Sequence, residues 1–321
     1  MAVNLHDEVS SNKQKSFFII VMFFVLIGFI GVLCGLVLSI YYYGGLNLGY
    51  ILSGLTISLI IAIIYILIFF SYGEKMILKS TGAVEAKRNN YPFLYHTTEA
   101  LSIAAGMRTP PKCYVIDDSS LNAYATGFKP EKSYVVVTTG LLNKLNRQEI
   151  EGVLAHEISH IKNQDIKVML LAAGLVGATV LLTDLLIRMF IFAPRGGSNN
   201  NSKSSGPLLI LVLVIGIILL ILSPIVAEMI KFSISRKREY LADSTGALLT
   251  RYPEGLASAL EKIKSDTNPL MKNTNKATAH LFISNPFTNK KTFMSGLFAT
   301  HPPIDDRIRR LRGETKHKNK N

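Results

Sequence analysis

The feature that most constrains this chain is a long uncharged stretch near its start. Residues 16–73 contain no Asp, Glu, Lys or Arg. A helix needs only about 20 apolar residues to cross a bilayer, so this stretch is long enough to cross twice. The chain is therefore expected to be a membrane protein.

The uncharged stretch divides into two apolar runs, residues 17–43 and 48–72, with a turn signal at residues 44–47 between them. The pattern predicts a transmembrane helical hairpin with almost no loop. A cleaved signal peptide is the alternative for the first run. It is disfavoured because the run is too long and a second run follows at once.

A second apolar hairpin is expected later in the chain. Residues 207–227 are uncharged and predict a span, whereas residues 168–192 are interrupted by Asp184 and Arg188. These two residues are four apart and can pair on one helix face, either near a membrane surface or as the lining of a cavity. Residues 193–206 form the predicted loop of this hairpin.

The composition combines apolar character with positive charge. Apolar residues make up 49% of the chain and the mean hydropathy is +0.30, yet 35 Lys and Arg face 22 Asp and Glu, a formal charge of +13. This combination excludes an ordinary soluble enzyme, a disordered tail protein and a collagen-like chain. Basic residues are not interleaved with aromatic ones, so contact with the lipid bilayer is expected and nucleic-acid binding is not.

The positions of the basic residues predict an orientation. The first predicted hairpin loop has no charge, and the second contains only Arg195 and Lys203. The opposite ends of the spans are flanked by Lys13, Lys15, Lys75, Lys79, Lys162, Lys167, Lys231, Arg236, Lys237 and Arg238. The excess of Lys and Arg at these ends places both termini and the large polar segments in the cytoplasm. Two cysteines, Cys34 and Cys113, give no disulfide framework.

These patterns predict a division of the chain into six segments. A polar domain is expected to be split in two parts by the second hairpin. The segments are a cytoplasmic tail (1–15), the first transmembrane hairpin (16–73), the first polar part (74–167), the second hairpin (168–227), the second polar part (228–312) and a basic tail (313–321).

The first polar part is expected to contain helices and a small sheet. β-Branched and aromatic residues predict strands at 112–117 and 133–138, with a third, irregular strand at 122–127. Residues 91–105 have helical character. Asn146 followed by Glu149 forms a capping box that predicts the start of another helix.

The helix that Asn146 begins carries a metal-binding pattern, His156-Glu157-Ile158-Ser159-His160. Residues four apart share a helix face, so His156 and His160 can bind one Zn²⁺ at about 2.0–2.1 Å each. Glu157 lies about 100° round the helix from His156, where it can hold a metal-activated water and take its proton. The pattern predicts a catalytic zinc site with Glu157 as the general base.

A catalytic zinc of this type needs a third protein ligand and an open fourth position. Glu239 and Asp243 lie one turn apart on a probable helix that follows the second hairpin. One carboxylate can bind the metal while the other accepts the free N–H of a ligand histidine. Spacing alone does not decide which of Glu239 and Asp243 binds the metal and which one orients a histidine.

The C-terminal segment adds two further candidates. A helix is expected to begin near residues 302–304, with proline in its first turn. His301 precedes this helix and can donate to the oxyanion or occupy the open metal position. Arg307 lies on it and can anchor a carboxylate. An ordinary capping turn followed by a surface helix is the alternative for both.

Together these motifs resemble the HtpX family of heat-shock-induced, membrane-integral zinc metalloproteases of bacteria, which are related to CAAX prenyl endopeptidases. The resemblance covers roughly residues 16–312. It implies that His156, His160 and Glu239 bind one zinc ion per chain, with Asp243 supporting a ligand. It also implies that His301 and Arg307 lie near the scissile carbonyl. The segment of Asn122, Ala123 and Tyr124 would be the edge strand that receives substrate.

The expected fold is α+β, a mostly helical gluzincin-like domain with a small sheet, plus four membrane helices in two hairpins. The family implies endoproteolysis of misfolded or damaged membrane proteins, or of unfolded polypeptides, in the bacterial cytoplasmic membrane. The two polar parts, 74–167 and 228–312, would together form the catalytic domain, which would face the cytoplasm. The alternatives are a membrane scaffold or transport component with a structural zinc, and a prenyl-protein protease. Homo-oligomerisation is left open.

Overall fold

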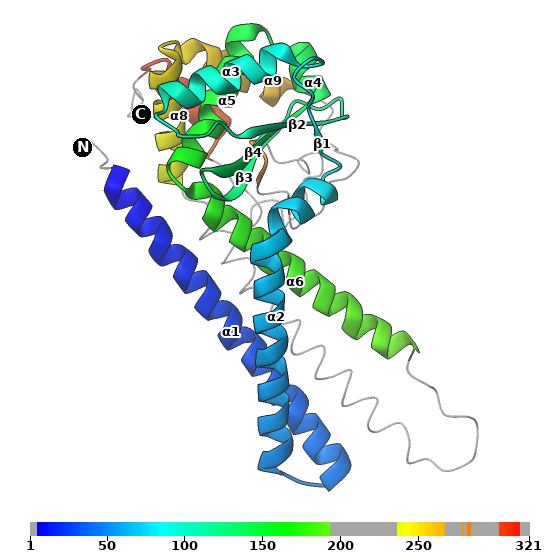
Figure 1. Ribbon diagram of the computed structural model, residues 1–321. Helices are drawn as coiled ribbons and strands as arrows, with labels where there is room; N and C mark the ends of the chain where they lie inside the picture. Colours follow the sequence, from blue (N-terminus) through cyan, green and yellow to red (C-terminus); the bar gives the residue numbers. More distant parts are fainter. Residues whose placement is uncertain (1–4, 193–235, 267–277, 279–280, 284–301, 315–321) are drawn as a thin grey trace, which may run out of the picture. The chain divides into compact units, whose positions relative to one another are not determined.

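A computed structural model describes residues 5–192, 236–266, 278, 281–283 and 302–314 (Figure 1). The chain divides into two compact units. The first unit comprises Met1–Ser16, Gly73–Ala173 and Ile230–Asn321, and the second comprises Phe17–Tyr72 and Gly174–Met229.

Two long helices, α1 (Leu5–Tyr43) and α2 (Leu48–Ser80), form a hairpin whose residues 17–72 belong to the second unit. Both extend beyond the predicted spans. Small residues let the two backbones approach closely, as is common between membrane helices. A Cβ added at Gly31 would lie 2.6 Å from the carbonyl oxygen of Gly54, which is closer than real Cβ atoms approach.

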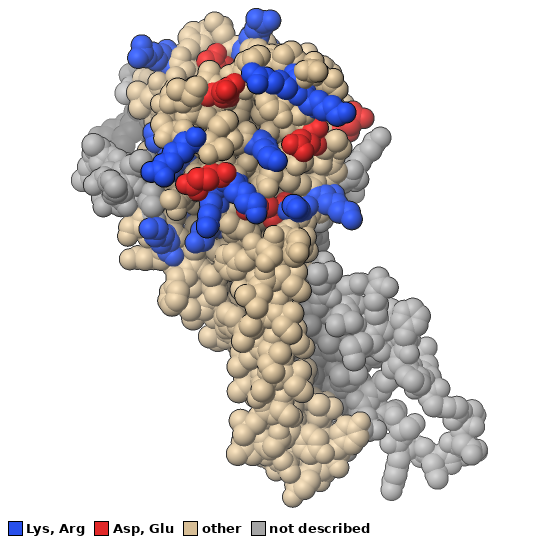
Figure 2. Space-filling view, viewed as in Figure 1, with Lys and Arg blue, Asp and Glu red and all other residues tan. Residues whose placement is uncertain are grey.

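The surface of this hairpin is unsuited to water. Among the described residues, segments of α1 (Ser10–Ile40) and α2 are long and apolar enough to cross a membrane, and only 6% of the most apolar window of α2 is buried. A core helix of a soluble protein would be mostly buried. Residues 16–73 contain no charged side chain, and the lower part of the described surface in Figure 2 shows none. The hairpin therefore fits a lipid environment.

The predicted third and fourth spans have different outcomes. Residues 168–192 lie within one helix, α6 (Asp165–Phe192), but its side chains are described only as far as residue 178, a part shorter than the about 20 residues that a membrane span needs. Residues 207–227 lie outside the described residues. The second membrane hairpin thus stays a prediction.

The first unit is built on a four-stranded mixed sheet with the order β1-β2-β4-β3. Strand β2 (Lys112–Ile116) pairs in parallel with β4 (Lys132–Thr138), and β3 (Ala123–Lys129) pairs antiparallel with β4. β1 (Val84–Glu85) pairs antiparallel with β2. β3 is therefore an edge strand, and its irregularity is a register shift after Gly127.

Helices of the first unit surround one central helix, α5 (Arg147–Lys162). α5 contacts β3 and β4 of the sheet, and also α3, α8 and α9. The helices that contact α5 are α3 (Pro92–Ala104), α8 (Arg236–Thr250) and α9 (Pro253–Ser265). α4 (Thr139–Lys144) packs on β4, and α10 (Ile304–Leu311) packs on α8 and α9. Most residues of α5 are therefore buried.

The start of α5 is fixed by its own sequence. The Asn146 side chain accepts from the Glu149 backbone N–H at 2.9 Å, and the Glu149 carboxylate accepts from the Asn146 N–H at 2.7 Å. This reciprocal capping box, confirmed here, satisfies two backbone donors that the helix cannot pair. Glu149 is also paired with Lys262 of α9 at 2.8 Å. The cap thus sets the first turn and ties α5 to a neighbouring helix.

Candidate metal centre

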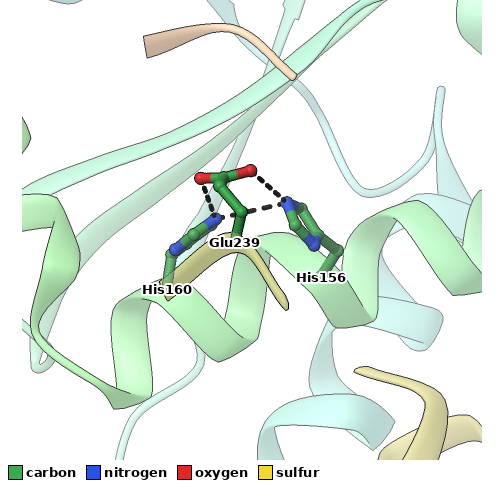
Figure 3. A group of neighbouring side chains, drawn as sticks. All are labelled: His156, His160 and Glu239. Carbon is green, nitrogen blue, oxygen red and sulfur yellow. Dashed lines mark hydrogen bonds and ion pairs between the residues drawn. The ribbon is translucent and has the colours of Figure 1, made fainter. Parts of the chain in front are cut away.

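Three buried side chains from two helices converge in the first unit (Figure 3). His156 and His160 stand one turn apart on α5, and Glu239 comes from α8. The two Nε2 atoms lie 3.2 Å apart. One oxygen of Glu239 is 3.9 Å from Nε2 of His156, and the other is 3.5 Å from Nε2 of His160.

These separations fit a single metal ion. Zn²⁺ bonds of about 2.0–2.2 Å in a tetrahedral arrangement place neighbouring ligand atoms about 3.3–3.6 Å apart. Nitrogen and carboxylate oxygen are donors that zinc accepts, and three protein ligands leave a fourth position open. Of the described residues, His156, His160 and Glu239 are the group whose ligand atoms come close enough to hold one metal ion, all within 4.8 Å of one another.

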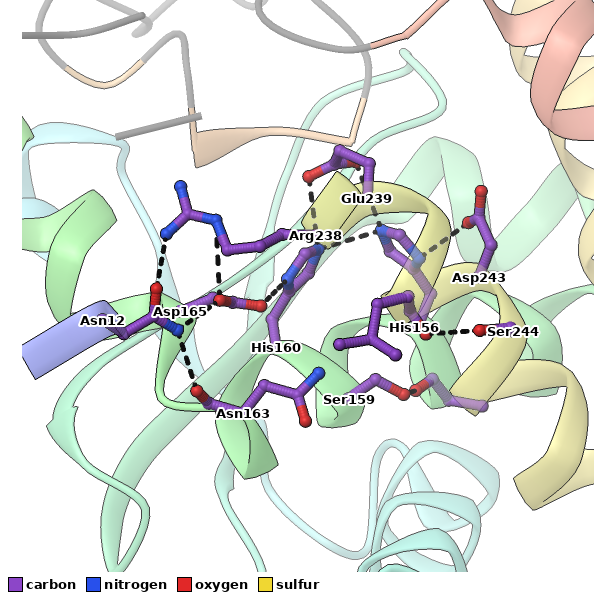
Figure 4. A network of polar contacts seen from close by, with 12 residues as sticks. Asn12, His156, Ser159, His160, Asn163, Asp165, Arg238, Glu239, Asp243 and Ser244 are labelled. Atoms are coloured by element: carbon purple, nitrogen blue, oxygen red, sulfur yellow. Dashed lines mark hydrogen bonds and ion pairs between the residues drawn. The ribbon is translucent and has the colours of Figure 1, made fainter. Parts of the chain in front are cut away.

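Both histidines are oriented by a carboxylate on their second ring nitrogen (Figure 4). Nδ1 of His156 lies 3.0 Å from Asp243, and Nδ1 of His160 lies 3.0 Å from Asp165. A hydrogen bond from Nδ1–H fixes the tautomer and leaves the lone pair of Nε2 toward the metal position. The metal site is therefore pre-organised on both sides.

Asp243 is held in turn by Arg307 of α10. Nε and Nη2 of Arg307 donate to the two carboxylate oxygens at 2.9 and 2.7 Å, a bidentate pair. Nη2 also lies 3.4 Å from both ring nitrogens of His156. Arg307 is fully buried, and its Nη1 makes no hydrogen bond within the described part of the chain.

The electrostatics of the site separate the two imidazoles. Burial and the charge of Arg307 lower the pKa of His156 to about 4. Burial also opposes a charge on His160, but the hydrogen bond to Asp165 and the charge of Glu239 outweigh it and raise the pKa of His160 to about 9. Without metal at neutral pH, His160 therefore carries a proton that it can donate to Nε2 of His156.

The same surroundings keep Asp243 ionised. Burial alone would raise its pKa, but the charge of Arg307 and hydrogen bonds from Arg307 and His156 outweigh burial and lower the pKa of Asp243 to about 2. An ionised carboxylate is the form that accepts the His156 N–H. The pairing with Arg307 therefore stabilises the carboxylate that orients the ligand.

The role of Asp165 was missed by the sequence analysis. α5 ends at Lys162, and Gln164 adopts a left-handed φ of 58°, which turns the chain so that Asp165 begins α6. This turn returns the Asp165 carboxylate to His160. An acidic residue five positions after the second histidine was the available signal, but a sharp turn by a non-glycine residue was not foreseeable.

The proposed substrate segment lies at the edge of the sheet. Asn122 precedes β3, and Ala123 and Tyr124 begin it. All three residues are buried. The Ala123 carbonyl accepts from the backbone N–H of Ile283 at 2.9 Å, and the Tyr124 ring packs on Phe282 with centroids 4.8 Å apart. The chain's own residues 282 and 283 therefore cover this end of the edge strand.

The remaining predicted site residues fall in different places. Glu157 is buried on α5 beside His156. Its negative charge contributes to the raised pKa of His160, so the two side chains are electrostatic neighbours. His301 lies outside the described residues.

Two histidines and a glutamate lie close enough to hold one metal ion, and buried carboxylates orient both histidines. On a chain with apolar hairpin helices, this arrangement is typical of a membrane-associated metallohydrolase. Residues 90–315 match peptidase family M48. The chain belongs to this family of metalloproteases.

Relatives that align over nearly the full length of the chain support the same family. The chain is 43% identical over 307 residues to a protein named Protease HtpX homolog from Dictyoglomus turgidum, covering 96% of this chain and 94% of that protein. A relative of the same name from Thermoanaerobacter pseudethanolicus is 42% identical, with coverages of 97% and 98%. The crystal structure of S. mikatae Ste24p matches with a TM-score of 0.42 and 22% identity, covering 81% of this chain and 64% of that one. The expected resemblance to HtpX proteases is confirmed.

Proposed function

We propose that the chain is a zinc-dependent endopeptidase that cleaves misfolded or damaged proteins of the bacterial cytoplasmic membrane. The observation that carries this proposal is the convergence of His156, His160 and Glu239 at metal-ligand separations beside the buried Glu157. The active site faces the cytoplasm in a multi-pass protein. Because the site and the apolar helices belong to one chain, proteins of the same membrane meet it at high effective concentration.

Zinc, when bound by the three ligands, would act as a Lewis acid on the scissile carbonyl and lower the pKa of the attacking water. Glu157 takes the proton of that water and passes it to the leaving amine, so one carboxylate serves as base and then acid. Asp243 and Asp165 hold the imidazoles in the required tautomer. The residues thus divide into two tasks, moving the proton and fixing the ligands.

Arg307 supports the oxyanion in this proposal. Its Nη1 makes no hydrogen bond among the described residues and lies 3.8 Å from Oε2 of Glu239, a metal ligand. A buried donor at this position can satisfy the negative charge that develops on the carbonyl oxygen. His301 is proposed as a second donor, or as a resting ligand at the open position.

Substrate binding is proposed to use the edge of β3. An extended peptide can pair with a sheet edge through backbone hydrogen bonds. The Ala123 carbonyl already accepts from Ile283, so a peptide that pairs at Ala123 must displace that residue. This requirement favours unfolded polypeptides, which can offer a long strand.

Two alternatives are less well supported. A scaffold with structural zinc would need a closed site with a fourth protein ligand. Membership of a peptidase family does not favour this alternative. A prenyl-protein protease has the same chemistry and differs in substrate. A lipidated peptide is therefore included in the test.

The test is cleavage by the full-length protein in detergent, using casein, native and denatured membrane proteins, and a farnesylated CAAX peptide. We expect cleavage at internal bonds of unfolded chains, loss of cleavage with a chelator and recovery with added zinc. Cleavage that a chelator does not affect would contradict the metal role. Cleavage of the farnesylated peptide alone would favour the prenyl-protein protease.

A further inference from the structure

Asn12 joins the metal centre from a remote part of the sequence. It lies near the start of α1, is 2% exposed, and belongs to the same unit as α5 and α8. Its amide Nδ2 donates to Oδ1 of Asp165 at 2.8 Å and to the Asn163 carbonyl at 3.1 Å. Its Oδ1 accepts from Nη1 of Arg238 at 2.9 Å (Figure 4).

These contacts complete the environment of a carboxylate that holds a metal ligand. Asp165 is 1% exposed, and its Oδ2 is taken by His160. Its Oδ1 has the Nδ2 of Asn12 at 2.8 Å, whereas Nε of Arg238 is 3.7 Å away. A buried carboxylate oxygen needs a close donor, and Asn12 supplies the closer of these two.

The residue type matches the task. Asparagine offers both an N–H donor and a carbonyl acceptor, so it can pair with an acid and with an arginine at once. An aspartate would lose the donor, and an aliphatic residue would lose both groups. Arg238 directly precedes Glu239 on α8, so Asn12 also contacts the helix turn that carries the third ligand.

We infer that Asn12 is a positioning residue of the metal centre, acting through Asp165 on His160. It plays for His160 the part that Arg307 plays for His156, and it brings the first helix of the chain into the support of the metal site. This inference rests on the proposed function because it takes His160 to be a zinc ligand. A merely structural role, in which Asn12 only fastens α1, predicts no specific coupling to Asp165.

The experiment is a double-mutant cycle on zinc affinity. The metal-stripped, full-length protein in detergent is titrated with zinc in competition with a chromophoric chelator. Loss of a residue that orients a ligand lowers metal affinity about 10–100-fold, which we expect for Asp165→Asn. We expect about tenfold weaker binding for Asn12→Leu. The double variant should bind no more weakly than Asp165→Asn alone, because both act on one contact.

Ser16→Ala is the matched control. Ser16 lies one turn after Asn12, is also buried, and its hydroxyl donates to the Asn12 backbone carbonyl at 2.8 Å. It should keep the parent affinity. If Asn12→Leu does not fold, Asn12→Ala removes the amide without added bulk and must show the same loss.

The inference is overturned if Asn12→Leu binds zinc like the parent, or if its effect multiplies with that of Asp165→Asn. Zinc affinity is measured without any peptide substrate. A protein that binds zinc but cleaves nothing would therefore contradict the proposed function and leave this inference standing. Equal zinc affinity in the parent and Asn12→Leu would contradict this inference and leave the proposed function standing.

Discussion

His156 and His160 are supported in the same way although their partners come from different parts of the chain. Each offers Nε2 to the metal position and Nδ1 to a buried carboxylate, Asp243 or Asp165. The carboxylates are fixed by further buried groups, above all Arg307 and Asn12. The geometry of the candidate metal site therefore depends on residues that are not candidate ligands themselves.

Asp243→Asn should weaken zinc binding about 10–100-fold, because the amide cannot accept the His156 N–H as strongly and loses the charge that pairs with Arg307 at two points. Chelator competition measures the loss. Asp305→Asn makes the same change at an exposed aspartate that pairs with Lys264, and it should bind zinc like the parent. Equal affinity in both variants would remove Asp243 from the support of the site.

Zinc binding should release a proton from His160. Its pKa is raised to about 9, so it is protonated at neutral pH without metal, while His156, with a pKa of about 4, is already neutral. A raised pKa makes zinc affinity fall as pH falls below 9, by about tenfold per pH unit. We expect the zinc Kd to rise about 100-fold from pH 8 to pH 6. An unchanged Kd over this interval would contradict the assignment.

The residues that sequence could and could not predict differ in a physical way. His156, Glu157 and His160 follow from helical spacing, which is local. The need for a third zinc ligand pointed to Glu239 or Asp243, and only the resemblance to HtpX proteases favoured Glu239. Asp165 depends on a left-handed turn, and Asn12 lies in a segment that reads as a tail. Local periodicity carries no signal for such long-range polar contacts.

The helices also combine features that local sequence predicts with features that it does not. α5 is predicted by its capping box, and α1 and α2 by the absence of charge over residues 16–73. Length and exposure are less predictable, since α1 starts at Leu5, well before the apolar run. The covering of Ala123 by Ile283 is not predictable, because no local pattern marks a strand that pairs with a distant residue.

The crossing of α1 and α2 can be tested with one substitution at two positions. A Cβ at Gly31 would meet the Gly54 carbonyl at 2.6 Å, so Gly31→Ala should force the helices apart and lower the free energy of unfolding by about 1–3 kcal/mol. At Gly28 the nearest atom is the mobile end of Leu55, at 3.3 Å. Gly28→Ala should be nearly neutral.

Unfolding in detergent, followed by circular dichroism as denaturant is added, compares the two variants. Equal stability of Gly31→Ala and Gly28→Ala would show that the close approach of the helices does not contribute. A larger loss for Gly28→Ala would contradict the crossing point itself.

At the scale of the whole molecule, the chain keeps its apolar and charged residues in separate segments. The first unit brings together Asn12, the end of α5, the start of α8 and Arg307, which are far apart in sequence. The residues between His160 and Glu239 include α6 and the predicted second hairpin. If the predicted second hairpin crosses the membrane, membrane segments lie between the candidate metal ligands along the chain, and folding of the site is expected to depend on insertion.

The composition predicted the class of molecule, and the motif predicted the chemistry. The four-helix membrane arrangement was a prediction from hydropathy, and the described residues support the first hairpin only. Hydropathy reports whether a helix prefers lipid. It does not report whether a helix that starts in a protein core, as α6 does with Ile166 and Leu170 buried, continues across the bilayer.

The central claim is that Glu157 moves the proton in a metal-dependent cleavage. Glu157→Gln keeps the size of the side chain and removes the base, and the direct measurement is zinc content together with the rate of casein cleavage. We predict one zinc ion per chain in both proteins and a loss of at least about 100-fold in kcat for Glu157→Gln. Cleavage by fully zinc-loaded Glu157→Gln at the parent rate would contradict the account.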